Sequence, residues 1–293
     1  MTVESINPVS ADAEAQPTRG AIDLHVHTSA SDGRYSPSEI VREALRTGLS
    51  AIAVTDHDTL GGIAEALDAA RGSSLEVVPG VEISTDAPSS EVHILGYFVD
   101  QDDPTLNRWL HDFQDSRLDR ARRILARLSR MGLPLNLGRV EEMANGGSVG
   151  RPHIAGAMVE RGYVSSIQEA FARYIGPNRP AYVPRRKVTP VEAIQLVLGA
   201  RGVPVLAHPR LVQQLVPGLA AQGLKGIEAY YAGYRSEDTD DLLELAQKHG
   251  LVATGGSDFH GEDVKPESRL GGVTVPTQAL AELRACYREL SLS

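Results

Sequence analysis

Histidines and carboxylates follow the short apolar segments of this chain, in a pattern suited to metal-dependent chemistry. Six of the nine histidines come directly after segments of strand length. Imidazole and carboxylate are ligands that Zn²⁺, Mn²⁺ and Fe²⁺ take in proteins. So many of these side chains in equivalent positions predict a site that holds several metal ions. The candidate ligands are His25, His27, Asp32, His57, Glu82, His93, His208, Asp258 and His260.

Spacing strengthens this interpretation for the first pair. His25 and His27 are two residues apart on a predicted strand, so both side chains point to one side and can bind the same ion. A single histidine after a strand is more often a structural residue, and we assign His111 and His249 to that class. For His153, which follows Arg151 and Pro152, a structural role and a ligand-binding role are both open.

The elements that must position these groups alternate along the chain. The apolar segments are continuous, as expected for strands covered on both faces. Capping boxes at Ser36 and Thr189 predict that helices begin there, between the apolar segments. This alternation predicts a parallel α/β sheet closed into a barrel of about seven strands, with the site at the carboxyl ends of the strands. The predicted strands are 21–24, 51–54, 76–83, 92–97, 203–207, 226–230 and 251–254.

One region interrupts this alternation. Residues 104–187 contain no convincing strand, and 106–131 are predicted to form a long helix rich in arginine. The region carries 15 Lys and Arg against seven Asp and Glu, a net charge of +8, which leaves −17 for the rest of the chain. We predict a basic helical insertion, or cap, within a barrel formed by 21–103 and 188–293. Some of its arginines would form surface ion pairs and others would meet a phosphate-bearing ligand.

Composition excludes several classes of protein. With 293 residues, 42% of them hydrophobic, the chain can build a large core. A net charge of −9 argues against a protein that coats duplex DNA. Cys286 is the only cysteine, so the chain has no internal disulfide and no cysteine metal site. No apolar run is long enough to span a membrane, and residues 1–20 are predicted to be a disordered tail. We expect a cytoplasmic protein.

The ordered motifs DLHVHT, SDG, TDHD, GVE, EVHILGY, AHP and GSDFH resemble those of the PHP (polymerase and histidinol phosphatase) superfamily. The similarity runs from about Ile22 to His260. It is strongest to the small bacterial phosphoesterases that include 3′,5′-nucleotide bisphosphate phosphatases and 5′-phosphate-dependent exoribonucleases. This resemblance implies a distorted (β/α)₇ barrel that holds three divalent metal ions. We favour Mn²⁺ as the metal, over Zn²⁺ or Fe²⁺.

All nine ligand positions that the resemblance implies are filled in this sequence. His25, His27, Glu82 and Asp258 would hold the first metal. Glu82 would bridge to a second metal, completed by His93 and His208. The third would be held by Asp32, His57 and His260. Asp23 would act as a hydrogen-bond acceptor that orients a ligand histidine.

The resemblance also implies the reaction. Metals lower the pKa of a shared water, and the resulting hydroxide attacks phosphorus. Arg117, Arg151 and His153 resemble the positions that bind a second phosphate of the substrate, with Arg185, Arg186 and Lys187 as weaker candidates. The expected substrate is a small phosphorylated nucleotide, first of all adenosine 3′,5′-bisphosphate.

Several alternatives stay open at this stage. A 5′→3′ exonuclease acting on short 5′-phosphorylated RNA would use the same metals, and so would a nucleoside 5′-monophosphate phosphatase of a specialised pathway. A TIM-barrel amidohydrolase also begins with a His-x-His pair. Its usual form needs a bridging lysine on a middle strand, and the four lysines of this chain are judged to be poorly placed. A metal-stabilised module without activity is the remaining alternative.

Overall fold

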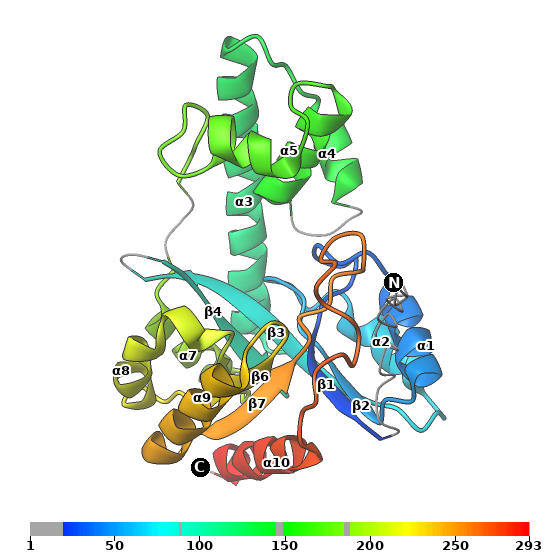
Figure 1. Ribbon diagram of the computed structural model, residues 1–293, viewed down its shortest axis with the longest axis vertical. Coiled ribbons are helices and arrows are strands. Elements are labelled where there is room, and N and C mark those ends of the chain that lie inside the picture. The colour runs from blue at the N-terminus through cyan, green and yellow to red at the C-terminus, as the bar shows by residue number, and fades with distance from the viewer. Residues whose placement is uncertain (1–19, 88–89, 145–148, 185–187, 293) are drawn as a thin grey trace, which may run out of the picture.

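The computed structural model of the protein describes residues 20–87, 90–144, 149–184 and 188–292. The tail predicted over 1–20 therefore lies outside the described residues except for Gly20. Arg185, Arg186 and Lys187, which we considered as substrate-binding residues, also lie outside them. The described chain forms a barrel-like sheet surrounded by helices, with a group of helices standing above one edge of the sheet (Figure 1).

Seven strands form one sheet in the order of the sequence. The first and last strands meet, because Val26 bridges to Phe259 and the His27 N–H donates to the Phe259 carbonyl at 2.9 Å. The predicted α/β barrel is therefore confirmed. The strands are β1 (Ile22–Val26), β2 (Ala51–Val54), β3 (Glu76–Asp86), β4 (Glu91–Tyr97), β5 (Val203–Leu206), β6 (Gly226–Tyr231) and β7 (Val252–Gly256).

The prediction of an entirely parallel sheet is wrong at β4, which pairs antiparallel with both β3 and β5. The reason is the short connection between Asp86 and Glu91. A parallel crossover needs a dozen residues or more, so a connection of this length allows only a hairpin. The reversal also places His93 near the start of its strand, and not after its end as the motif suggested. The start of an antiparallel strand lies at the same edge of the barrel as the ends of its neighbours.

Helices cover the outside of the barrel. Both predicted capping boxes are present: the Ser36 and Thr189 side chains accept from backbone N–H groups three residues further on. Apolar side chains of α1, α2, α7, α9 and α10 pack on the strands in separate clusters. No helix in the described ranges is long and apolar enough to cross a membrane. The helices of this layer are α1 (Pro37–Thr47), α2 (Ile63–Ala70), α7 (Pro190–Gly199), α8 (Val216–Ala220), α9 (Ser236–His249) and α10 (Thr277–Leu292).

The described part of the segment between β4 and α7 consists of helices and the loops that join them, and no strand is found in 104–144 or 149–184. α3 rises from the barrel, and the shorter helices pack around its far half (Figure 1). They share a hydrophobic cluster of their own, which includes Ile124, Leu128, Ile154 and Met158. We call these helices the cap: α3 (Pro104–Arg130), α4 (Leu137–Met143), α5 (Arg151–Glu160), α6 (Ile167–Ala170) and a π-helix (Phe171–Ile175).

Candidate metal centre and active site

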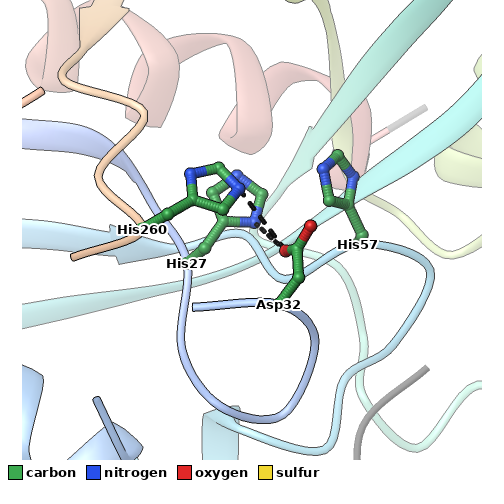
Figure 2. A group of neighbouring side chains, drawn as sticks. All are labelled: His27, Asp32, His57 and His260. Atoms are coloured by element: carbon green, nitrogen blue, oxygen red, sulfur yellow. Dashed lines mark ion pairs between the residues drawn. The ribbon is translucent and has the colours of Figure 1, made fainter. Parts of the chain in front are cut away.

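The predicted ligands converge at the edge of the barrel below the cap. Their nitrogen and oxygen atoms form three overlapping groups, within each of which the atoms lie within 4.8 Å of one another. Figure 2 shows one of them, with the side chains of His27, His57 and His260 gathered around Asp32. The groups are His25, His27, Glu82 and Asp258; His57, Glu82 and His93; and His27, Asp32, His57 and His260.

Glu82 is the centre of this arrangement. Its Oε2 lies 3.3 Å from His25 Nε2, 3.2 Å from His27 Nε2 and 3.1 Å from His57 Nδ1. Its Oε1 lies 2.8 Å from His93 Nδ1 and 3.2 Å from His208 Nε2. The side chain is only 1% exposed. One carboxylate therefore faces five imidazoles, as a bridging ligand between two ions would.

The site contains nitrogen and oxygen atoms whose lone pairs could bind cations. His25 Nε2 and His27 Nε2 lie 3.1 Å apart, although only one of them could carry the proton of a hydrogen bond. His27 Nδ1, His57 Nδ1 and Glu82 Oε2 are buried with no hydrogen-bond partner in the described part of the chain. Buried polar atoms are ordinarily satisfied, and a bound cation would satisfy these atoms together. The residues thus fit divalent metal ions.

A second layer of acids holds the ligands in place, and it includes a residue that the motifs did not reveal. Glu228 lies on β6, and its Oε1 forms a hydrogen bond of 3.0 Å with His25 Nδ1. Its Oε2 accepts the His208 backbone N–H at 2.9 Å. The Asp23 carboxylate accepts the backbone N–H of the candidate ligand His25 at 3.4 Å, and it also accepts from Ser257 and from the Gly271 N–H. Asp23 therefore contacts this histidine through its backbone, while Glu228 contacts its ring. The sequence signal that could have pointed to Glu228 is an acidic residue within the otherwise apolar segment Gly226–Tyr231.

Asp56 organises the turn that carries Asp32. Its carboxylate accepts from the backbone N–H and the hydroxyl of Thr28 and from the hydroxyl of Ser31, each at 2.7 Å. The side chain is buried, and burial raises the pKa of its carboxyl. These three bonds fix the turn after β1 and so place Asp32 opposite His260.

The backbone is strained at three of the site residues. Asp58, His208 and Asp258 have φ values of 54°, 31° and 52°, in the left-handed region that side chains disfavour. Such strain costs free energy and persists where the surrounding structure enforces it, commonly at functional sites.

Protonation of the metal-free site gives a testable pH dependence. Burial alone would lower the pKa of His27 and His93, but Glu82 and its neighbouring acids outweigh it and raise these pKa values to about 9 and about 10. These two groups stabilise the metal-free fold below pH 6.5, and this contribution is lost as the pH rises through 9 to 10. Burial lowers the pKa of His57 to about 4, so that group opposes folding as the pH falls below 6.5.

We therefore expect the melting temperature of the metal-free protein to be highest near pH 6.5 and to fall toward pH 10. Metal ligands must be deprotonated, so the gain in melting temperature on adding metal will grow over the same range. Thermal unfolding of chelator-treated and metal-loaded protein from pH 6 to pH 10 measures both trends. A gain that shrinks with rising pH would contradict this assignment of protons.

A cavity of about 290 Å³ lies between the candidate metal ligands and the cap. Asp32, His57 and His93 line its barrel side, and the cap contributes basic side chains. The predicted residues Arg117, Arg151 and His153 all line it. Arg120, which we did not single out, lines it as well, and its Nε donates to the Val183 carbonyl at 2.7 Å.

Arg117 connects the cap to the barrel. Its guanidinium pairs with the fully buried Asp58 and donates to Ser84 Oγ at 2.8 Å, while Gln114 donates to the Asp58 carbonyl at 3.1 Å. Arg117 Nε is buried without a hydrogen-bond partner among the residues described. The guanidinium is thus held by Asp58 and Ser84 of the barrel at the wall of the cavity, which His57 also lines.

His153 has a structural role, and it also lines the cavity, so the ligand-binding role that the sequence left open stays a prediction. Its Nδ1 accepts the Gly150 N–H at 3.0 Å and so caps α5. This bond places the ring proton on Nε2, where it can be donated. Burial, together with the charge of Arg117, lowers the pKa of His153, so the ring is a neutral donor at the cavity wall.

Arg151 lies at the start of α5 and also lines the cavity. Its guanidinium stands over Phe171, 5.3 Å from the ring centroid, and 3.9 Å from Glu91 Oε2. Other arginines of the cap form exposed pairs, such as Arg123 with Asp119 and Arg139 with Glu160. The predicted surface ion pairs of the cap are therefore present, and a phosphate-binding role for the arginines that line the cavity stays a prediction.

One lysine reaches the candidate metal ligands. Lys265, in the segment between β7 and α10, lies with its Nζ 2.6 Å from Asp258 Oδ2. It does not lie on a middle strand, and neither do Lys225 or Lys248, so none of these three has the place of the bridging lysine of an amidohydrolase. Lys187 lies outside the described residues.

A groove of about 690 Å³ adjoins the cavity. Asp32, Pro152 and His153 line both spaces. The groove then runs between Arg34 and Val264 of the barrel and Met143 of the cap. A ligand anchored in the cavity can therefore extend past the candidate metal centre.

Comparisons with known proteins show the family to which this chain belongs. The sequence matches the PHP domain family over residues 23–136. The chain is 34% identical to the 3′,5′-nucleoside bisphosphate phosphatase of Chromobacterium violaceum, over 82% of this chain and 87% of that protein. It is 35% identical to the 5′-3′ exoribonuclease Rnm of Escherichia coli, over 81% of this chain and 84% of that one. A crystal structure from Bifidobacterium adolescentis, described as that of a metal-dependent phosphoesterase, matches with a TM-score of 0.82 and 32% identity, covering 92% and 97% of the two chains.

The chain belongs to the PHP family, as its motifs indicated. It is a metal-dependent phosphoesterase, which excludes the module without activity.

Proposed function

We propose that the enzyme hydrolyses the 3′-phosphate of nucleoside 3′,5′-bisphosphates, converting adenosine 3′,5′-bisphosphate to AMP and phosphate. The observation that carries this proposal is the cavity with candidate metal ligands on one side and Arg117, Arg151 and His153 on the other. A substrate with two phosphates can place one on each side. The relative from Chromobacterium violaceum is named for this reaction.

Three divalent ions are part of this proposal, and Mn²⁺ is our first choice. His25, His27, Glu82 and Asp258 would hold one ion, and Glu82, His93 and His208 a second. Asp32, His57 and His260 would hold the third, and His57 lies close enough to Glu82 to serve the second as well. When bound, such ions lower the pKa of water and neutralise phosphate oxygens.

The protein's own contribution is to hold the second phosphate. Arg117 is fixed by Asp58 and Ser84, and Arg151 by its contact with Phe171, so neither must be ordered when the substrate binds. Arginine donates two parallel hydrogen bonds to phosphate, and His153 adds a neutral donor from Nε2. An anchored 5′-phosphate fixes the distance of the 3′-phosphate from the metal ligands, which is positioning catalysis.

A second candidate is a 5′→3′ exoribonuclease acting on short 5′-phosphorylated RNA. The groove that adjoins the cavity favours it, because a chain continuing past the scissile phosphate would need such a space. The relative from Escherichia coli carries this name.

A location in the cytoplasm and the absence of duplex DNA as a partner stay predictions from the sequence.

A matched panel of substrates tests these functions. With Mn²⁺ present, release of phosphate and nucleoside would be measured from adenosine 3′,5′-bisphosphate, AMP, 3′-AMP and a short 5′-phosphorylated RNA. We expect the bisphosphate to yield AMP while both monophosphates react slowly.

Other outcomes would replace the proposal. Mononucleotides shed from the RNA faster than the bisphosphate is hydrolysed would make the enzyme an exoribonuclease. Fast hydrolysis of AMP would make it a 5′-monophosphate phosphatase. No turnover of any member by metal-loaded protein would show that the ligand is of another kind.

A further inference from the structure

Asp258 has two carboxylate oxygens in different surroundings. Oδ1 faces the imidazoles, 3.4 Å from His25 Nε2 and 3.1 Å from His27 Nε2. Oδ2 faces away from them, toward Tyr231 and Lys265. It accepts from Tyr231 Oη at 2.6 Å and from Lys265 Nζ at 2.6 Å. One oxygen therefore belongs to the candidate metal centre, and the other is fully engaged by the protein.

Tyr231 and Lys265 support each other. Lys265 Nζ also donates to Tyr231 Oη at 2.9 Å and lies 5.1 Å from the centroid of the tyrosine ring. Their side chains come from two separate places in the chain, the end of β6 and the segment after β7. Three groups thus form a closed triangle of hydrogen bonds, which fixes the rotation of the Asp258 carboxylate.

The segment that carries Lys265 is itself held. Ser268 is fully buried, and its hydroxyl donates to the Ser257 carbonyl at 2.5 Å. The Gly271 N–H donates to Asp23 Oδ2 at 2.8 Å. Because this segment is tied to the strand end that carries Asp258, the lysine is positioned together with its partner.

We propose that Lys265 and Tyr231 are positioning residues that hold Asp258 through Oδ2, so that this acid offers only Oδ1 to the metal bound by His25, His27 and Glu82. The proposal rests on the assignment of Asp258 as a metal ligand. Hydrogen-bonded partners of ligands commonly set metal affinity, and their loss costs about 10- to 100-fold.

The sign of the effect separates positioning from simple charge. A lysine close to a metal repels it, so removing the cation would by charge alone tighten metal binding. If the lysine acts by holding Asp258, its removal weakens binding instead. Tyr231→Phe removes the second bond to Oδ2 without any change of charge, so positioning predicts weakening there too.

The experiment measures metal binding without substrate. Metal-free full-length wild type, Lys265→Met, Tyr231→Phe and Lys265→Arg would be titrated with Zn²⁺ in competition with a chromophoric chelator. Visible spectra of the Co²⁺ forms would report changes in coordination. We expect one bound equivalent to weaken by about 10- to 100-fold in Lys265→Met and Tyr231→Phe. Lys265→Arg keeps a cationic donor and should bind close to wild type.

Lys248→Met is the matched control, because Lys248 is exposed on α9 away from the site. Circular dichroism would establish that each variant is folded. Unchanged binding and spectra in Lys265→Met and Tyr231→Phe would overturn the proposal, and so would tighter binding in Lys265→Met alone. A wild type that binds no Zn²⁺ would remove the assignment of Asp258 as well. An unexpected result from the nucleotide panel would leave this proposal standing.

Discussion

Replacing Glu82 with glutamine will lower the kcat of the phosphoesterase reaction by about three orders of magnitude or more. Both carboxylate oxygens of Glu82 face imidazoles, and five histidines lie within 3.3 Å of them. Glutamine has nearly the same shape but no charge, and one of its two terminal groups is a donor. It cannot bridge two cations, so we expect metal content and kcat to fall together.

Glu76→Gln is the control for this change. Glu76 begins the same strand at the opposite end of the barrel and pairs with Arg284 at the surface. Activity would be measured at saturating Mn²⁺, together with bound metal after removal of excess ions. Wild-type metal content and turnover in Glu82→Gln would refute its place at the centre of the site.

Replacing Arg151 with methionine will lower kcat/KM for adenosine 3′,5′-bisphosphate by about 10- to 100-fold, because hydrogen bonds to a charged group contribute about 1.5–3 kcal/mol. The loss should come mainly through KM if the arginine binds the 5′-phosphate equally in ground and transition states. Methionine keeps the apolar contact with Phe171. For 3′-AMP, which lacks the 5′-phosphate, kcat/KM should stay unchanged.

Arg139→Met is the matched control in the cap. Arg139 is half-exposed and pairs with Glu142 and Glu160, away from the cavity. Equal losses for the bisphosphate and for 3′-AMP in Arg151→Met would argue against a phosphate anchor and for a general disturbance of the cap.

Residue types and local spacing were enough to predict the chemistry of the site. Histidine and carboxylate are short-range signals: their types and their place beside apolar strand segments can be read without knowing the fold. The capping boxes at Ser36 and Thr189 are equally local, and both helices begin where these boxes predict. The charge of the insertion also came from counting, since charge does not depend on conformation.

Which of these groups lie in contact depends on how distant segments pack together. Glu228 and Lys265 carry no motif, and their roles arise because β6 and the segment after β7 lie beside β1 and Asp258. The reversal of β4 depends on a short connection, and only pairing with both neighbours shows it. Likewise, Arg117, Arg120 and Arg151 face the cavity while Arg123 and Arg139 face solvent, because the rotation of a helix is set by the surface on which it packs. Contacts between distant segments depend on packing, and the residue types alone do not specify it.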